Sequence, residues 1–215
     1  MHQEPATRGR ARRETAVVVA LAAAFVLAQL TDHWIYVHCS YPAVYDRGWA
    51  RLLRVVGYAP TWAIAALALT LRDWGTPSRA SIGQAARRGL VLFMSVSISG
   101  LLAEALKLLF RRERPALTGG AHVFRAWSDQ PFSSAQLGLP SSEGAVAFAA
   151  GAALARLFPE ASVVWYGLAI GCGLTRVAAG AHFMSDVVLA GVVGYVTSAW
   201  IWRVSTKARS SPSTR

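Results

Sequence analysis

The chain alternates between long apolar runs and short basic segments, and this pattern limits its fold more than any other feature. A helix needs about 20 apolar residues to cross a bilayer core of about 30 Å, and it satisfies its own backbone hydrogen bonds there. We therefore expect an all-α, polytopic membrane protein built as a bundle of six transmembrane helices. The six runs are residues 16–37, 55–71, 89–110, 141–158, 161–178 and 182–204.

The composition supports this reading and argues against a nucleic-acid-binding protein. The chain is 54% hydrophobic and only 15% charged, which is unusually apolar for a soluble domain. Its net charge of +11 comes from arginines that lie between the apolar runs, as loop charges of membrane proteins do. Cys39 and Cys172 form neither a disulfide framework nor a metal-ligand spacing. We expect no nucleic-acid partner and no metal.

The basic segments predict an orientation and a division of the chain. With six spans, the N-terminus, the loop 72–88 and the C-terminal tail fall on one side, and all three are basic, so we place them in the cytoplasm. A cleaved signal peptide is the alternative for the first run, but the run continues into Trp34 and Tyr36. We predict a basic N-terminus over residues 1–15, a membrane domain over 16–204 and a disordered tail over 205–215.

The connecting segment after the first run carries three arginines at helical spacing. Arg47, Arg51 and Arg54 are separated by four and three residues. This spacing predicts one face of an interfacial helix, although a merely solvated face has the same pattern.

A histidine and an aspartate four residues apart open the last apolar run. Residues i and i+4 share one face of a helix, so Asp186 is expected to accept a hydrogen bond from His182. Such a bond fixes the tautomer of the imidazole and leaves its other nitrogen free to act as a base or nucleophile. An isolated pair of this kind is more often structural, so the other polar clusters decide the interpretation.

Two further clusters lie at the outward ends of predicted spans. Lys107, Arg111 and Arg114 are spaced by four and three, which predicts one helical stripe, and Arg112 falls outside it as a boundary charge. Residues 140–143, Pro-Ser-Ser-Glu, open a helix whose free N–H groups form a natural anion site, unless the serines only cap the helix. Cations, a helix N-terminus and an oriented histidine on one face together indicate chemistry on a phosphate.

These residues carry a family resemblance. The chain resembles the type 2 phosphatidic acid phosphatase/haloperoxidase superfamily, in its membrane-embedded lipid phosphatase branch. Lys107 through Arg114-Pro115 matches the first motif in full. Residues 140–143 match the second motif, Pro-Ser-Gly-His, only in the first two positions. With a glutamate at position 143, the chain resembles a subgroup of the family, the lipid A phosphatases. Thr175-Arg176, His182 and Asp186 match the third motif with one Ser to Thr change.

The resemblance implies a role for each matching residue. His182 is the expected nucleophile, which forms a phosphohistidine, and Asp186 orients it. The expected phosphate-binding groups are Lys107, Arg114, Arg176, Ser141 and Ser142. No metal or cofactor is implied.

The proton donor is the position at which the chain departs from the family. Glu143 replaces the histidine that protonates the leaving oxygen in the family. A carboxyl group there can act as the acid if burial raises its pKa, or can remain a structural anion paired with arginine. His122, in the outward loop, is the alternative donor.

The expected function is therefore a membrane lipid phosphatase acting on a lipid phosphate monoester or pyrophosphate. The active site would face the periplasm from a bacterial inner membrane, and membrane lipids would be its partners. Lipid A, undecaprenyl pyrophosphate, phosphatidic acid and phosphatidylglycerol phosphate are candidate substrates. A lipid phosphotransferase with the same intermediate and a non-catalytic protein that binds anionic lipid are the alternatives.

Overall fold

The computed structural model describes residues 4–74 and 86–207, and the regular elements in these ranges are helical. The only β-structure there is two isolated bridges, between Arg112 and Phe124 and between Glu113 and Leu137. The predicted all-α fold is thus confirmed. The α-helices are α1 (Glu4–Cys39), α2 (Gly48–Val55), α3 (Ala59–Trp74), α5 (Arg87–Phe110), α6 (Pro115–Thr118), α7 (Ser142–Leu157), α8 (Ser162–Ala178) and α9 (Met184–Lys207), and the 3₁₀ helices are Pro42–Asp46 and Pro159–Ala161.

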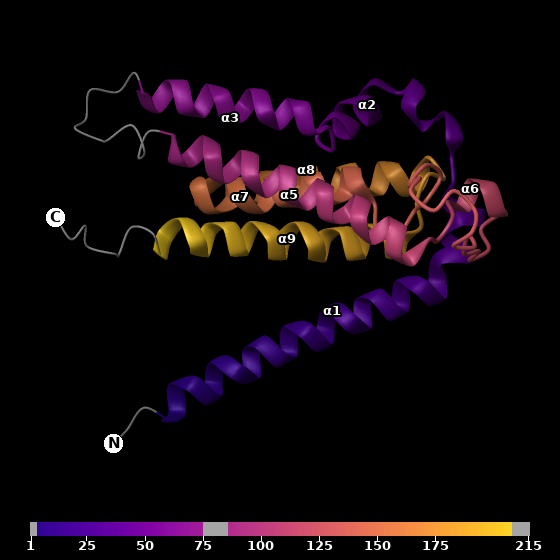
Figure 1. Cartoon of the computed structure of the whole chain (residues 1–215), viewed down its shortest axis with the longest axis horizontal. Helices are drawn as coiled ribbons and strands as arrows, with labels where there is room; N and C mark the ends of the chain where they lie inside the picture. The colour runs from indigo at the N-terminus through magenta and orange to yellow at the C-terminus, as the bar shows by residue number, and fades with distance from the viewer. Residues whose placement is uncertain (1–3, 75–85, 208–215) are drawn as a thin grey trace.

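Helix α7 is the centre of the bundle. It packs against α5, α8 and α9, and α3 packs on the outer side of α5 (Figure 1). Most residues of α7 are alanine or glycine and are buried, so neighbouring backbones approach closely, as in many membrane bundles. Gly194 of α9 is an example, because an added Cβ would lie 2.6 Å from the carbonyl oxygen of Ala145.

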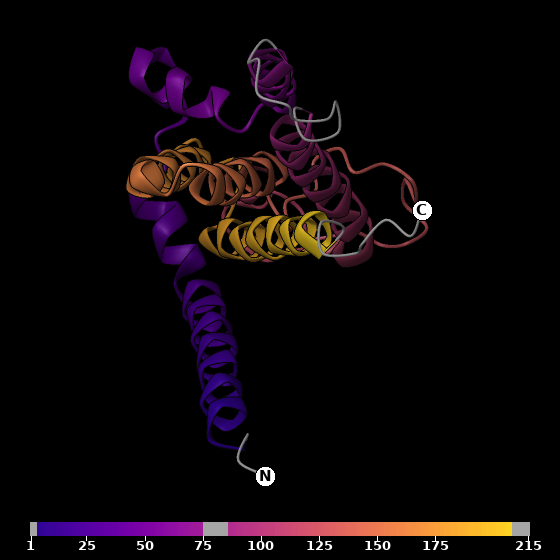
Figure 2. The same ribbon diagram turned by 90° about the vertical axis from the view of Figure 1, so that its left-hand side faces the viewer.

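Helix α1 diverges from this bundle. It lies near α9 at its C-terminal end and runs away from the other helices toward the N-terminus (Figures 1 and 2). Most of its described side chains are exposed, including Val26, Leu27 and Leu30, as expected for a helix surrounded by lipid. Among its described side chains, Ala28 and Asp32 are the buried ones, so this part of α1 is attached to the bundle locally.

Four described helical segments are long and apolar enough to cross a membrane. These are Val19–Cys39, Arg87–Phe110, Pro159–Ala178 and Met184–Lys207. The helices α2 and α3, which meet at 63°, are a fifth if the bent pair forms one span. A helix occupies each of the six predicted regions, but α7 has only 16 residues. The chain is a helical membrane protein, and the count of six spans stays a prediction.

Several predicted boundaries shift. Helix α1 already begins at Glu4, inside the segment predicted as a separate N-terminus. Helix α9 extends to Lys207, three residues into the predicted tail. Residues 75–85 of the predicted basic loop and 208–215 of the tail lie outside the described residues. The three spaced arginines begin at the N-cap of α2 and continue along it, so the predicted helix is present there.

Candidate active site

The polar clusters meet at one end of the bundle. The C-terminal ends of α5 and α8 and the N-terminal ends of α7 and α9 lie there, beside the irregular segment that joins α5 to α7 (Figure 1). This arrangement follows from the antiparallel order of neighbouring helices. It brings the motif residues together, although Lys107 and Asp186 are 79 positions apart.

Lys107 is held against the start of α7. Its ammonium group is nearly buried and donates to Glu104 Oε1 at 2.8 Å and to the hydroxyl of Ser142, which itself bonds to Glu104. Ser141 caps α7, because its Oγ accepts a hydrogen bond from the N–H of Gly144 at 3.2 Å. Ser141 therefore caps the helix, which was the alternative to an anion-binding role, whereas Ser142 contacts Lys107.

Two arginines lie close to one another beside this helix start. Burial, and after it the positive charge of Arg176, lowers the pKa of Arg114. Arg114 donates to the carbonyl oxygen of Leu137 at 3.5 Å, and Arg176 donates to the Tyr45 hydroxyl at 3.2 Å. Two neighbouring guanidinium groups repel each other, so an anion bound between them would be stabilised.

Glu143 lies between two arginines. Its Oε2 atom is 3.3 Å from Nη1 of Arg176 and 3.5 Å from Nε of Arg54, which comes from α2. The guanidinium of Arg54 also lies over the Tyr45 ring, 4.8 Å from its centroid. The sequence did not single out Tyr45, and its contacts link the 3₁₀ helix Pro42–Asp46 to the site. These two ion pairs match the structural-anion interpretation of Glu143.

His182 is buried, and its hydrogen bonds define its tautomer. Nδ1 lies 3.0 Å from the carbonyl oxygen of Gly138 and 3.4 Å from Oδ2 of Asp186. A carbonyl oxygen only accepts, so Nδ1 carries the hydrogen and Nε2 keeps its lone pair. Burial lowers the pKa of His182, although the Asp186 carboxylate opposes the shift, so the ring is neutral near neutral pH.

The His182–Asp186 pair does not form in the way the spacing suggested. Helix α9 begins at Met184, so His182 precedes the helix instead of lying on its face. The Asp186 carboxylate reaches back over the first turn and accepts the N–H of Phe183 at 2.8 Å. The predicted contact between His182 and Asp186 is present, but it forms across the N-terminal turn of α9 and not along one face of the helix.

The predicted stripe of Lys107, Arg111 and Arg114 is wrong in its middle member. Helix α5 ends at Phe110, and Arg111 adopts a left-handed conformation with φ of 55°, so helical spacing no longer applies. Arg111 donates instead to the carbonyl oxygens of Arg125 at 3.1 Å and Ala126 at 2.9 Å, which organises the following loop.

Arg112, interpreted from the sequence as a boundary charge, is a buried part of the site. Its guanidinium donates to the Asp186 carboxylate, to Ser185 Oγ at 2.7 Å and to Gln29 Oε1 at 2.8 Å. It also lies over the Phe183 ring, 5.0 Å from the centroid. The turn at Arg111 redirects the chain and causes this placement.

Asp32 of α1 completes the buried network behind Asp186. Its carboxylate accepts the Ser185 N–H at 3.0 Å and the Ser185 hydroxyl, and it lies 3.8 Å from Arg112. His122 contacts Asp32 at 3.2 Å and meets the Phe183 ring edge-on at 4.7 Å. A charged residue inside an apolar run was the sequence signal for Asp32.

Comparison with known proteins identifies the family. The model of the PAP2 superfamily matches residues 88–210. The chain belongs to the PAP2 superfamily. Proteins named lipid A 1-phosphatase from Rhizobium johnstonii and Rhizobium etli are 40% identical over 114 residues and 41% identical over 102 residues. These matches cover 52% and 46% of this chain but only 44% and 43% of the relatives, and no solved structure matches.

The PAP2 match contains every candidate site residue that the motifs singled out. Within it, Lys107 contacts Ser142, Arg176 contacts Glu143, and His182 contacts Asp186. Asp32, Tyr45 and Arg54, which the motifs did not supply, lie outside the matched segment. In the part of the chain that the structure describes, no group of three or more His, Cys, Asp or Glu side chains is arranged to hold a metal ion.

Proposed function

We propose that this PAP2 protein is a lipid phosphatase that hydrolyses a phosphate monoester or pyrophosphate through a phosphohistidine on His182. One observation carries the proposal: His182 is buried with Nδ1–H directed to Gly138, beside a set of cations. The relatives named lipid A 1-phosphatase support the same activity class. The cations are Lys107, Arg114 and Arg176.

The proposed reaction has two steps. Nε2 of His182 attacks phosphorus with its lone pair, and the bond to the leaving oxygen breaks as that oxygen takes up a proton. Water then gives a proton to the base left by the first step and attacks phosphorus, so that the P–N bond breaks, inorganic phosphate leaves and the imidazole is restored. The cations bind the non-bridging oxygens and stabilise the charge that develops on them.

The two candidate proton donors differ in their contacts. Glu143 contacts Arg176, one of the proposed phosphate-binding groups, whereas His122 contacts Asp32 behind Asp186. We therefore assign proton donation to Glu143. Glu143 pairs with Arg176 and Arg54 as a carboxylate, and a bound phosphate would compete with it for Arg176, so that the carboxyl group can take up the proton that it then donates.

The proposed substrate is a phosphorylated membrane lipid, with a lipid A-type phosphate first because of the relatives' names. We propose a bacterial inner membrane location with the site facing the periplasm. The basic segments of the sequence support that orientation. Reporter fusions after Arg215 and near Trp127 test it, since they should report opposite sides of the membrane.

The activity is tested with purified protein in detergent micelles and a panel of lipid A, phosphatidic acid, phosphatidylglycerol phosphate and undecaprenyl pyrophosphate. We expect phosphate release from at least one lipid, loss of release in His182→Ala, and an acid-labile phosphoprotein in rapidly quenched wild-type reactions. Binding of these lipids without release or transfer of phosphate would contradict the proposal. Transfer to an added lipid alcohol in place of water would identify a phosphotransferase.

A further inference from the structure

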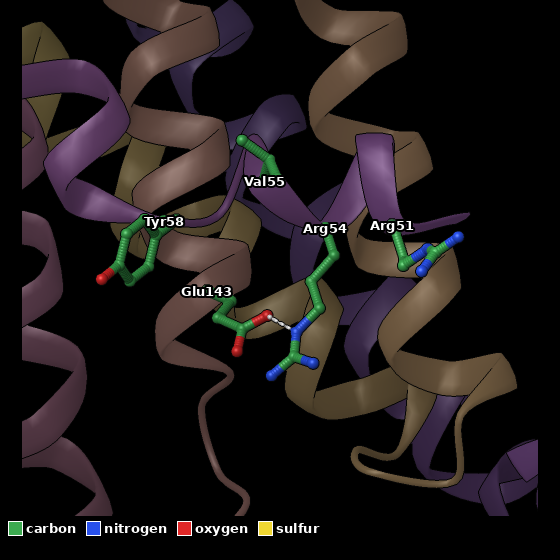
Figure 3. Close-up of a pocket in the computed structure, with 5 residues that line it drawn as sticks. All are labelled: Arg51, Arg54, Val55, Tyr58 and Glu143. Carbon is green, nitrogen blue, oxygen red and sulfur yellow. Dashed lines mark ion pairs between the residues drawn. The ribbon is translucent and has the colours of Figure 1, made fainter. Parts of the chain in front are cut away.

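A pocket of about 420 Å³ opens beside the candidate active site. Its volume lies within the range of about 300–1,000 Å³ that is typical of small-molecule sites. Both lining arginines come from α2: Arg54 reaches Glu143, whereas the Arg51 side chain extends away from that carboxylate (Figure 3). The lining residues are Arg51, Arg54, Val55, Tyr58 and Glu143.

The pocket carries an excess of positive charge. Arg54 faces Glu143 at 3.5 Å, and that carboxylate is shared with Arg176. Arg51 is exposed, and its guanidinium makes no ion pair or hydrogen bond with the residues that the structure describes. One carboxylate therefore balances three guanidinium groups, which favours binding of an additional anion.

Glu143 also connects the pocket to the phosphate-binding cations. The same oxygen atom, Oε2, contacts Arg54 in the pocket and Arg176 in the active site. A phosphate bound at Arg176 is thus adjacent to the pocket. The rest of a lipid headgroup attached to that phosphate has a space next to it that Arg51 and Arg54 line with positive charge.

We propose that this pocket binds a second acidic group of the substrate headgroup, a phosphate monoester or diester a few atoms from the phosphate that is hydrolysed. The inference rests on the proposed phosphatase function and adds a substrate class, namely headgroups that carry two phosphates. Arg51 is the specificity residue, because its guanidinium is exposed at the pocket and free to bind the second anion. Arg54 contributes through its position between Glu143 and Tyr45.

The test compares phosphatidylglycerol phosphate with phosphatidic acid of the same acyl chains in the same micelles. Both lose phosphate from a primary glycerol oxygen, but only the first carries a second phosphate. We expect wild type to have the higher kcat/KM with phosphatidylglycerol phosphate. Arg51→Gln should lower the ratio of the two kcat/KM values about tenfold, mainly through KM, as expected for one charge-assisted contact.

Two variants control for other effects of the substitution. Arg47→Gln removes an exposed arginine at the N-cap of α2 that does not line the pocket, and it should leave the ratio unchanged. Arg51→Lys keeps the charge and should lower the ratio less than Arg51→Gln. An equal loss on both substrates, or an unchanged ratio, would overturn the proposal.

The failure of this proposal is distinguishable from failure of the phosphatase function. Hydrolysis of phosphatidic acid that is lost in His182→Ala supports the function alone, and equal wild-type kcat/KM values on the two lipids would then overturn only the pocket assignment. Phosphatidylglycerol added to the phosphatidic acid assay supplies the anion from a neighbouring lipid. If phosphatidylglycerol activates the wild type but not Arg51→Gln, the pocket binds a neighbouring lipid. That result would contradict the proposal that the second phosphate belongs to the substrate headgroup.

Discussion

Arg112 donates to the carboxylate of Asp186, and both side chains are fully buried. The carboxylate beside His182 therefore has a permanent cationic partner that belongs to the protein. The two partners contact different oxygens of the carboxylate: Oδ1 contacts Arg112, and Oδ2 contacts His182. The position of His182 depends on both contacts.

Replacing Arg112 should therefore destabilise the protein. Arg112→Met keeps much of the side-chain volume but leaves Asp186 buried without its partner, which typically costs about 3–5 kcal/mol. We expect a lower free energy of unfolding and a loss of turnover, measured by chemical unfolding in micelles and by phosphate release. Arg47→Gln, at an exposed arginine, is the matched control. A wild-type free energy of unfolding in Arg112→Met would show that the Arg112–Asp186 ion pair does not stabilise the fold.

The lowered pKa of His182 predicts a pH dependence with a definite sign. The ordinary pKa of histidine is about 6.5, so the unfolded chain binds a proton at a higher pH than the folded one. The stability that follows from this difference is present above pH 6.5 and is lost as the pH falls below it. Phosphohistidine formation, which needs neutral imidazole, should also have its acidic limb below about pH 6.5. Rapid-quench measurements across pH check this, with His38→Gln as control for an exposed histidine; an acidic limb centred well above pH 6.5 would contradict it.

Glu143→Gln separates a proton donor from a structural anion. Glutamine keeps the size of the side chain but cannot release a proton, so hydrolysis of a lipid phosphate should fall about 10²–10⁴-fold. With nitrophenyl phosphate, whose leaving group hardly needs protonation, the loss should be much smaller. Comparable losses on both substrates would assign Glu143 to the Arg54–Arg176 contacts alone, and His122→Gln would be the next variant to assay.

Gly138→Ala tests the close approach of the loop to Asp186. An added Cβ would lie 2.8 Å from Oδ2 of Asp186, so the carboxylate or the loop must move, and the carbonyl that accepts from His182 moves with it. We expect the rate of phosphate release to fall strongly while the free energy of unfolding changes little. Gly167→Ala in α8 meets no atom within 4 Å and should be neutral or slightly stabilising, as alanine usually is in a helix. Equal activity of the two variants would refute the argument.

Apolar length predicted the helices well because it depends on local sequence. Helices occupy all six predicted regions, and α7 begins at Ser142, one residue after the predicted start. The number of spans was harder to infer. The short helix α7 is enclosed by its neighbours, and the chain between α2 and α3 bends by 63°, so length alone does not decide which helices cross the membrane.

Within the site, the sequence predicted which residues meet more reliably than how they meet. His182 and Asp186 do contact each other, although outside the expected helical geometry. The assignment of Arg111 and Arg112 failed because helical spacing was extended past Phe110, where the backbone turns. The position of Asp32 inside an apolar run marks it as unusual, but its partner Ser185 is 153 residues away, and no local pattern identifies such a partner.

The divergence of α1 has a practical consequence for measuring this protein's affinity for lipids. An apolar groove of about 320 Å³ lies between Leu21 of α1 and α9 side chains such as Val188 and Val192. In a bilayer, acyl chains fill such a wedge, so a lipid meets the protein by diffusing within the plane of the membrane. Its effective concentration is then its mole fraction in the bilayer. Dilution of the lipid surface, and not of the bulk solution, is the variable that an affinity measurement has to control.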